Sequence, residues 1–253
     1  MKSGAGVWIV AVWLVFTVTV NAKCDADARK LLSAYSQLTA CRDNRIYWRD
    51  GSSMLYDDGR KKSFDELLGR ADIQDMFHYD YPKGSHSYGR APKRNFDPGR
   101  IRNEAFFKKL YGATANEVRK NLKRIRWLPR SAPKPVYLRV TRVNGVDRAL
   151  EAVSRELDRL PKRYLKYLYP VGGTFKWRRI AGTKRLSVHS FGAAVDINVK
   201  HSAYWRWSRG GYRYRNEIPL KIVEIFERHG FIWGGKWYHY DTMHFEYRPE
   251  LLK

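Results

Sequence analysis

The sequence predicts an α+β fold: a small, mainly antiparallel sheet with flanking helices, preceded by a largely helical and loop-rich N-terminal extension. Apolar residues recur at helical spacing in residues 146–160 and 219–229. Residues 193–199 form a continuous apolar run, and residues 242–247 alternate between polar and apolar, as strands do. With 43% hydrophobic residues in 253, the chain has enough apolar material for a packed core.

The first 22 residues have the organisation of a secretory signal peptide. Lys2 provides a positive charge, residues 7–20 are apolar except for two threonines, and residues 20–22 (Val-Asn-Ala) offer small or neutral side chains for cleavage. The apolar stretch is shorter than the roughly 20 residues of a membrane span. We therefore expect cleavage, a periplasmic or secreted protein, and no transmembrane segment in the mature chain. An uncleaved N-terminal anchor is the alternative.

The chain is strongly basic, since 49 Lys and Arg against 25 Asp and Glu give a formal net charge of +24. We expect no nucleic-acid partner, because no motif for reading nucleic acid is present and an exported protein does not meet it. Anionic envelope polymers, acidic peptide stems and membrane surfaces are the partners that this charge favours. Net charge does not identify a reaction, so the catalytic function has to be inferred from sequence motifs.

Cys24 and Cys41 are the only cysteines, and both follow the expected cleavage site. In an oxidising compartment they predict a disulfide that ties down the N-terminus of the mature chain. Two unrelated thiols are the alternative. A metal site is not expected, because neither cysteine belongs to a Cys-x-x-Cys pair.

The extension, residues 23–130, predicts short helices separated by loops. The expected helices and helical turns are residues 25–38, 63–68, 72–77, 103–111 and 115–125. Thr114 and Glu117 form a capping box before the last of them. Residues 78–102 are rich in Gly, Pro, Tyr and basic residues and predict a long loop, which in a compact domain is usually functional or disordered.

Residues 131–135 (Ser-Ala-Pro-Lys-Pro) form the clearest linker, and residues 131–253 then predict one catalytic domain. The expected strands are residues 136–140, 193–199 and 242–247, and the expected helices are residues 146–160 and 219–229. The first helix stops at Pro161, and Gly230 follows the second. The alternation in the last strand places His244 and Glu246 on one face.

His189, Asp196 and His244 are the candidate metal ligands. Two imidazoles and one carboxylate form a catalytic zinc set that leaves one position open for water. Asp196 lies inside an apolar run, where a carboxylate is costly unless it is paired or bound to a metal. On spacing alone, a His–Asp hydrogen-bonded pair in the core is an equal alternative. Asp241, three residues before His244, is close enough to take a proton from a water held there.

Two motifs carry a family resemblance: Ser-x-His-x-x-Gly-x-Ala-x-Asp at residues 187–196 and Gly-x-Trp-x-x-x-Asp-x-x-His-Phe-Glu at residues 235–246. Together they resemble the zinc D-alanyl-D-alanine carboxypeptidase and L-alanyl-D-glutamate endopeptidase family, over roughly residues 135–253. This resemblance implies a hedgehog-like α+β fold and peptide stems of peptidoglycan as the substrate. It also implies one Zn²⁺ per chain, held by His189, Asp196 and His244, with Asp241 as the general base.

The resemblance further assigns Arg178 to the arginine upstream of the first ligand, although Arg179, Lys184 and Arg185 are nearby cations. Arg178 would hold the scissile carbonyl and stabilise the negative oxygen that develops on it. Ser187 resembles a hydroxyl that contacts substrate, with a hydrogen bond inside a turn as the alternative.

The sequence therefore predicts an exported zinc metallopeptidase that hydrolyses an amide bond in peptidoglycan stem peptides, as a carboxypeptidase or an endopeptidase. A catalytically inactive, zinc-containing cell-wall-binding module is the alternative, but a structural zinc site needs neither Asp241 nor Arg178. A cationic protein that adheres to surfaces is a third possibility, and its binding would disappear with salt. Residues 23–130 either extend the substrate groove or wrap around the catalytic core.

Overall fold

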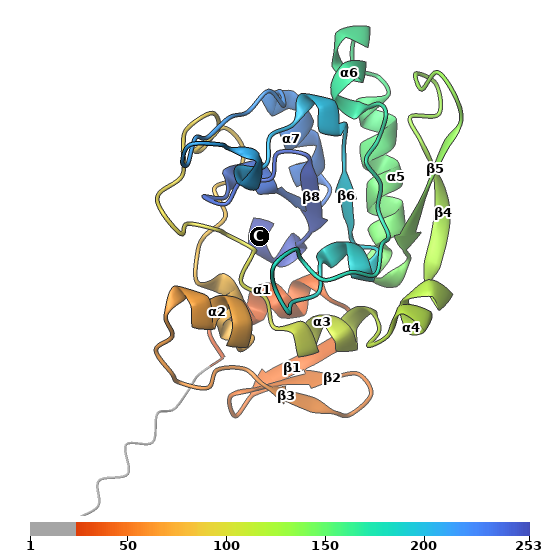
Figure 1. The fold of residues 1–253 in the computed structure, drawn as a ribbon. Helices are drawn as coiled ribbons and strands as arrows, with labels where there is room; N and C mark the ends of the chain where they lie inside the picture. Colours follow the sequence, from red (N-terminus) through yellow and green to blue (C-terminus); the bar gives the residue numbers. More distant parts are fainter. Residues whose placement is uncertain (1–23) are drawn as a thin grey trace, which may run out of the picture.

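Three small antiparallel sheets, with helices packed around them, make up residues 24–253, the part of the chain that the computed structural model describes (Figure 1). The predicted α+β class is confirmed, whereas the predicted signal peptide lies outside the described residues. The helices are α1 (Ala26–Ala34), α2 (Phe64–Arg70), α3 (Glu104–Tyr111), α4 (Ala115–Lys120), α5 (Val146–Leu157), α6 (Leu165–Leu168) and α7 (Leu220–Arg228). The strands are β1 (Leu38–Arg42), β2 (Arg45–Trp48), β3 (Ser53–Leu55), β4 (Leu122–Trp127), β5 (Val136–Thr141), β6 (Ala194–Asp196), β7 (Phe231–Trp233) and β8 (His244–Tyr247).

The sheet that positions the two sequence motifs has the order β6–β8–β7. The last residue of β6, Asp196, is paired in register with the first residue of β8, His244. Helix α7 covers this sheet, and its Phe226 stacks on Phe245 of β8 with ring centroids 3.8 Å apart. The helix period predicted α7 correctly, because its apolar stripe is the face buried against the sheet. The predicted strand 193–199 is shorter than expected, since only three of its residues pair.

The hairpin β4–β5 pairs over six residues, from Leu122 opposite Thr141 to Trp127 opposite Val136, and α5 packs against it (Figure 1). The prediction of a helix over 115–125 is wrong beyond α4, because β4 begins at Leu122. Alternation in β4 buries Ile125 and Trp127 and exposes Arg124 and Arg126. Its basic residues also favour helix, so only pairing with β5 and burial against α5 select the strand.

Residues 38–55 form the sheet β1–β2–β3, which the sequence did not predict. Its strands have three to five residues, too few for a period of two to be visible in the sequence. The predicted disulfide between Cys24 and Cys41 is present, with 5.7 Å between the two Cα atoms. The disulfide joins Cys24, which precedes the N-cap residue of α1, to Cys41 in strand β1.

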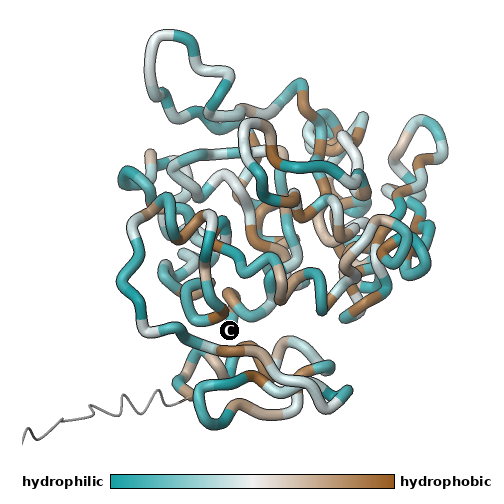
Figure 2. Tube along the Cα trace, turned by 60° about the horizontal axis from the view of Figure 1, so that its bottom comes forward, coloured by the Kyte–Doolittle hydropathy of each residue, from teal (hydrophilic) through white to brown (hydrophobic). Residues whose placement is uncertain are grey.

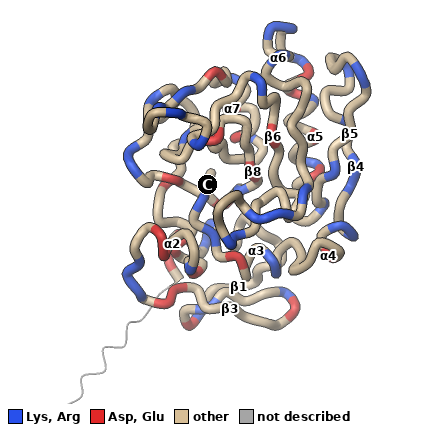
Figure 3. The backbone as a smooth tube through the Cα atoms, in the orientation of Figure 1, with Lys and Arg blue, Asp and Glu red and all other residues tan. Residues whose placement is uncertain are grey.

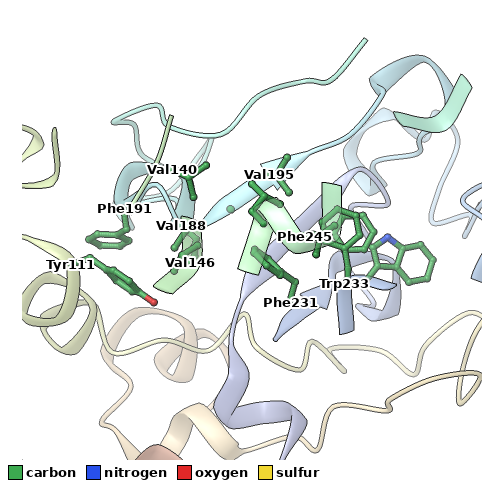
Figure 4. Packing of buried hydrophobic residues seen from close by; sticks show 14 of the residues in the cluster. Tyr111, Val140, Val146, Val188, Phe191, Val195, Phe231, Trp233 and Phe245 are labelled. Atoms are coloured by element: carbon green, nitrogen blue, oxygen red, sulfur yellow. The ribbon is translucent and has the colours of Figure 1, made fainter. Parts of the chain in front are cut away.

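One continuous cluster of buried side chains joins the N-terminal and C-terminal parts of the described chain. Figure 4 shows Tyr111 of α3 beside Phe191, two residues after His189, and their ring centroids are 6.0 Å apart. In the same view Val195, Phe231 and Phe245 lie within the sheet that carries the motifs. Figure 2 shows hydrophobic residues interspersed along the elements, as expected when each element buries one face.

The loop 78–102 contains no helix or strand, but a buried ion pair anchors it. Nζ of Lys236 lies 2.6 Å from Oε1 of Glu227 and 2.8 Å from the carbonyl oxygen of Gly84. The hydroxyl of Tyr81 donates to the same Glu227 oxygen at 2.7 Å. Lys236 is fully buried in these contacts and therefore acts in the attachment of the loop.

Lys and Arg residues are distributed along the whole described chain, including the hairpin β4–β5 (Figure 3). The excess of positive charge is therefore not confined to one segment of the chain. Within residues 24–253, no helix has the length and apolar character needed to cross a membrane.

Candidate active site

A pocket with a volume of about 270 Å³ brings together the residues predicted for metal binding, catalysis and substrate contact. All of them line it: His189, Asp196, His244, Asp241, Arg178 and Ser187. The two sequence motifs meet because β6 and β8 are neighbours in one sheet, although α7 and β7 separate them along the chain.

Three potential ligand atoms converge in this pocket. Nε2 of His189 lies 3.0 Å from Oδ1 of Asp196 and 3.2 Å from Nδ1 of His244. The remaining side of the triangle, between Nδ1 of His244 and Oδ1 of Asp196, is 2.9 Å. In a tetrahedral zinc site with bonds of 2.0–2.1 Å, neighbouring ligand atoms are separated by roughly 3.3 Å. The spacing and the donor types therefore fit zinc.

The other ring nitrogens indicate where the protons lie. Nδ1 of His189 is 2.5 Å from the carbonyl oxygen of Thr174, and Nε2 of His244 is 3.2 Å from Oε2 of Glu246. Both partners are acceptors, so each neutral ring carries its proton on that side. Burial lowers the pKa of His244, but Asp196 and Glu246 raise it by more, to about 10, so without a metal this ring holds a second proton toward Asp196. A bound dication would replace that proton, and hydrogen bonds from the outer ring nitrogens are typical of histidine ligands.

A tight turn presents His189 to the pocket. It lies in the 3-10 helix Val188–Phe191, whose N-cap Ser187 accepts a hydrogen bond from the His189 N–H at 3.4 Å. Gly192 ends the turn with φ of +66°, and a Cβ atom there would lie 2.7 Å from Cδ2 of Leu122. Ser187 thus makes the turn hydrogen bond and also lines the pocket.

Asp241 lines the same pocket as the three ligand atoms and has an unsatisfied carboxylate oxygen. Its Oδ1 is buried and has no hydrogen-bond partner among the described residues. Burial, and then the negative charge of Asp196, raise the pKa of Asp241 to about 6, and a bound dication would act in the opposite direction. Its backbone is held because its N–H donates to Gly234 at 3.0 Å, and a Cβ on Gly234 would lie 2.6 Å from the Asp241 carbonyl oxygen.

Glu246 supports His244 from within the core. Its Oε2 lies 3.3 Å from Nη1 of Arg102, and its Oε1 accepts from Nη1 of Arg248 at 3.3 Å. Burial raises the pKa of the Glu246 carboxyl, but Arg102, His244 and Arg248 lower it more, to about 2. Glu246 is therefore ionised and orients the outer nitrogen of His244.

Arg178 is exposed and lines the pocket, and its side chain makes no ion pair among residues 24–253. Its carbonyl oxygen accepts from the N–H of Ser187 at 3.0 Å, which ties its backbone to the turn that carries His189. Sequence reasoning missed two further arginines of this pocket, Arg100 and Arg102. Their only signal was the basic and aromatic composition of the loop 78–102.

Residues 181–247 match a family model described as D-alanyl-D-alanine carboxypeptidase. The match contains His189, Asp196, Asp241 and His244, and it confirms the family resemblance of this segment. At the family level it supports a peptidase that acts on peptidoglycan. With the disulfide, it favours an extracytoplasmic protein. No curated protein and no solved structure matches the chain.

Asp97, also unpredicted, is fully buried next to the pocket. Its Oδ1 accepts from the backbone N–H of His239 at 2.9 Å, and its Oδ2 lies 2.5 Å from Nδ1 of His239 and 3.0 Å from Nη1 of Arg100. Burial raises the pKa of Asp97, but His239 and Arg100 outweigh it and hold the pKa below the ordinary 3.8.

This lowered pKa makes the contribution of Asp97 to stability depend on pH. The ionised carboxylate stabilises the fold above pH 3.8, and the stabilisation disappears as the pH falls through the folded-state pKa. We expect Asp97→Asn to lower the free energy of unfolding by about 2–3 kcal/mol at neutral pH. In urea titrations this difference from wild type should shrink below the ordinary pKa of 3.8. If the difference in unfolding free energy between variant and wild type were the same at neutral pH and below pH 3.8, the assignment would be contradicted. Asp80→Asn, at an exposed position of the same loop, is the control.

Proposed function

We propose that this protein is an exported, zinc-dependent peptidase that hydrolyses an amide bond in the peptide stems of peptidoglycan. The observation that carries the proposal is the convergence of His189, Asp196 and His244 in a pocket that is also lined by Asp241, which has an unpartnered carboxylate oxygen. The family match over residues 181–247 supports the same class of reaction.

His189, Asp196 and His244 would hold one zinc ion. Zinc, when bound, would supply Lewis acidity, which polarises a carbonyl group and makes a water molecule more acidic. The Thr174 carbonyl and the Glu246 carboxylate would keep the two rings in the orientation that the ligands need.

Asp241 would act as the general base and then as the general acid. Its free carboxylate oxygen would accept the proton of the attacking water and pass it to the nitrogen of the leaving amine. Arg178 would donate hydrogen bonds to the carbonyl oxygen as negative charge develops on it. Ser187, on the same pocket wall, would contact the substrate backbone.

Digestion of purified muropeptides, followed by mass spectrometry, tests this function. We expect either the loss of one D-alanine, for a carboxypeptidase, or a break between L-alanine and D-glutamate, for an endopeptidase. Because the ligand set fits zinc, a chelator should abolish cleavage and added Zn²⁺ should restore it. Zinc-loaded protein that binds muropeptides and leaves every mass unchanged would contradict the proposal and indicate a cell-wall-binding module.

A further inference from the structure

Part of the pocket wall comes from residues 96–102, a segment of the long loop that lies outside the matched residues 181–247. We propose that Arg100 of this segment forms an anion subsite that binds a carboxylate group of the substrate. The inference rests on the proposed function and specifies the charge that the substrate must carry in this pocket.

The 96–102 segment has a defined position, because directed hydrogen bonds tie it to the residues that precede Asp241. Nε1 of Trp237 donates to the carbonyl oxygen of Pro98 at 2.6 Å, and the N–H of Tyr238 donates to the carbonyl oxygen of Phe96 at 2.8 Å. These bonds place the segment next to the second sequence motif, and two of its side chains, Arg100 and Arg102, line the pocket.

Arg100 is held at one corner of its guanidinium group. Nη1 lies 3.0 Å from Oδ2 of Asp97, and Cζ lies 5.8 Å from the centroid of a Trp237 ring. The same carboxylate oxygen of Asp97 contacts both Arg100 and His239, and His239 also lines the pocket. The other side-chain N–H groups of Arg100 have no protein acceptor among the described residues, while the side chain remains 14% exposed.

The surroundings of Arg100 are rich in positive charge. Arg102 lines the same pocket, and Nη1 of Arg185 donates to the backbone carbonyl of Arg100 at 3.0 Å. Burial, and then the charges of Arg102 and Arg100, lower the pKa of Arg185 to about 9. The pocket is lined by three arginines and three carboxylates, so a dication on the ligand set would make it net positive.

Arg100 is the arginine best suited to a substrate carboxylate. Arg102 is less exposed than Arg100, at 9% against 14%, and it pairs with Glu246, which supports His244. Arg178 is proposed for the scissile carbonyl. A guanidinium group matches a carboxylate with two parallel hydrogen bonds, which gives both affinity and orientation. In a stem peptide with lysine at the third position, two sources carry this group: the free C-terminus and the carboxylate of the D-glutamyl residue.

Three matched stem peptides separate these sources: one with both carboxylates, one with a C-terminal amide, and one with D-isoglutamine in place of D-glutamate. For wild-type protein we expect kcat/KM to fall about 10- to 100-fold for the amide that removes the partner of Arg100. Arg100→Gln should lower kcat/KM for the parent peptide by a similar factor and make it equal to that of the sensitive amide. Arg90→Gln removes one exposed charge from the same loop. It should leave the ratio of kcat/KM between the parent peptide and each amide as in wild type.

Binding measured without turnover provides a second readout. In the Asp241→Asn background, tryptophan fluorescence should report weaker binding of the sensitive amide, because Trp205, Trp207 and Trp237 line the pocket. Arg100→Lys should recover part of the discrimination, because it keeps the charge and loses the two-bond geometry. Equal discrimination by wild type and a folded Arg100→Gln variant would overturn the inference. Failure of wild type to cleave any of the three peptides would refute the proposed function instead.

Discussion

Asp241→Asn is expected to keep its zinc and its fold and to lose about 10²- to 10⁴-fold in the rate of stem-peptide cleavage. Asparagine has the same shape but cannot accept the proton. Oδ1 of Asp241 has no hydrogen-bond partner among the described residues, so its replacement breaks no contact of that oxygen in the fold. The melting temperature should therefore stay within a few degrees of wild type.

Turnover, zinc content and melting temperature have to be measured on the same preparation of Asp241→Asn. Unchanged turnover with zinc bound would contradict the role of general base. Loss of zinc would instead make Asp241 a ligand and reopen the role of Asp196, whose Oδ1 is the carboxylate atom closest to both rings. Asp80→Asn, a substitution of the same type at an exposed position, should change none of the three quantities.

His189→Ala and His244→Ala are each expected to reduce bound zinc from about one ion per chain to a small fraction after dialysis. Each removes one of three converging ligand atoms, and this should weaken zinc binding by more than the roughly 10- to 100-fold that follows loss of a supporting contact. Elemental analysis of the dialysed proteins measures the effect.

His239→Ala is the matched control for this experiment. His239 lines the same pocket, but its Nδ1 is engaged with Asp97 and it lies outside the ligand triangle. We expect this variant to keep its zinc. Full retention of zinc in both His189→Ala and His244→Ala would refute the ligand assignment, whereas loss in His239→Ala would place a fourth protein ligand in the pocket.

The structure relates the N-terminal part of the chain to the pocket in two ways. Aromatic residues of α3, among them Phe107, pack on Phe191 in the turn that carries His189, with ring centroids 5.8 Å apart. Arg100 and Arg102, at the end of the long loop that precedes α3, line the pocket itself. The sequence left open whether this part wraps around the core or extends the substrate groove. The packing of α3 on the core corresponds to the first alternative, and the two arginines in the pocket wall correspond to the second.

The sequence by itself determined the α+β class, the helix α7, the disulfide partners and six of the residues that meet in the pocket. Each of these depends on a local or strictly spaced pattern. The apolar stripe of α7 repeats over several turns, Cys24 and Cys41 had no other partner, and the spacing of His189, Asp196, Asp241 and His244 belongs to a recognisable motif.

Only the tertiary structure decided the rest. β4 is a strand because β5 and α5 offer it a partner and a buried face, although its own basic residues also favour helix. Asp97 and Arg102 are held at the pocket by hydrogen bonds to residues about 140 positions away, His239 and Glu246, and Arg100 is held there by Asp97. A side chain that acts through such long-range contacts leaves no period or spacing in its own segment, so its role becomes visible only when the chain is folded.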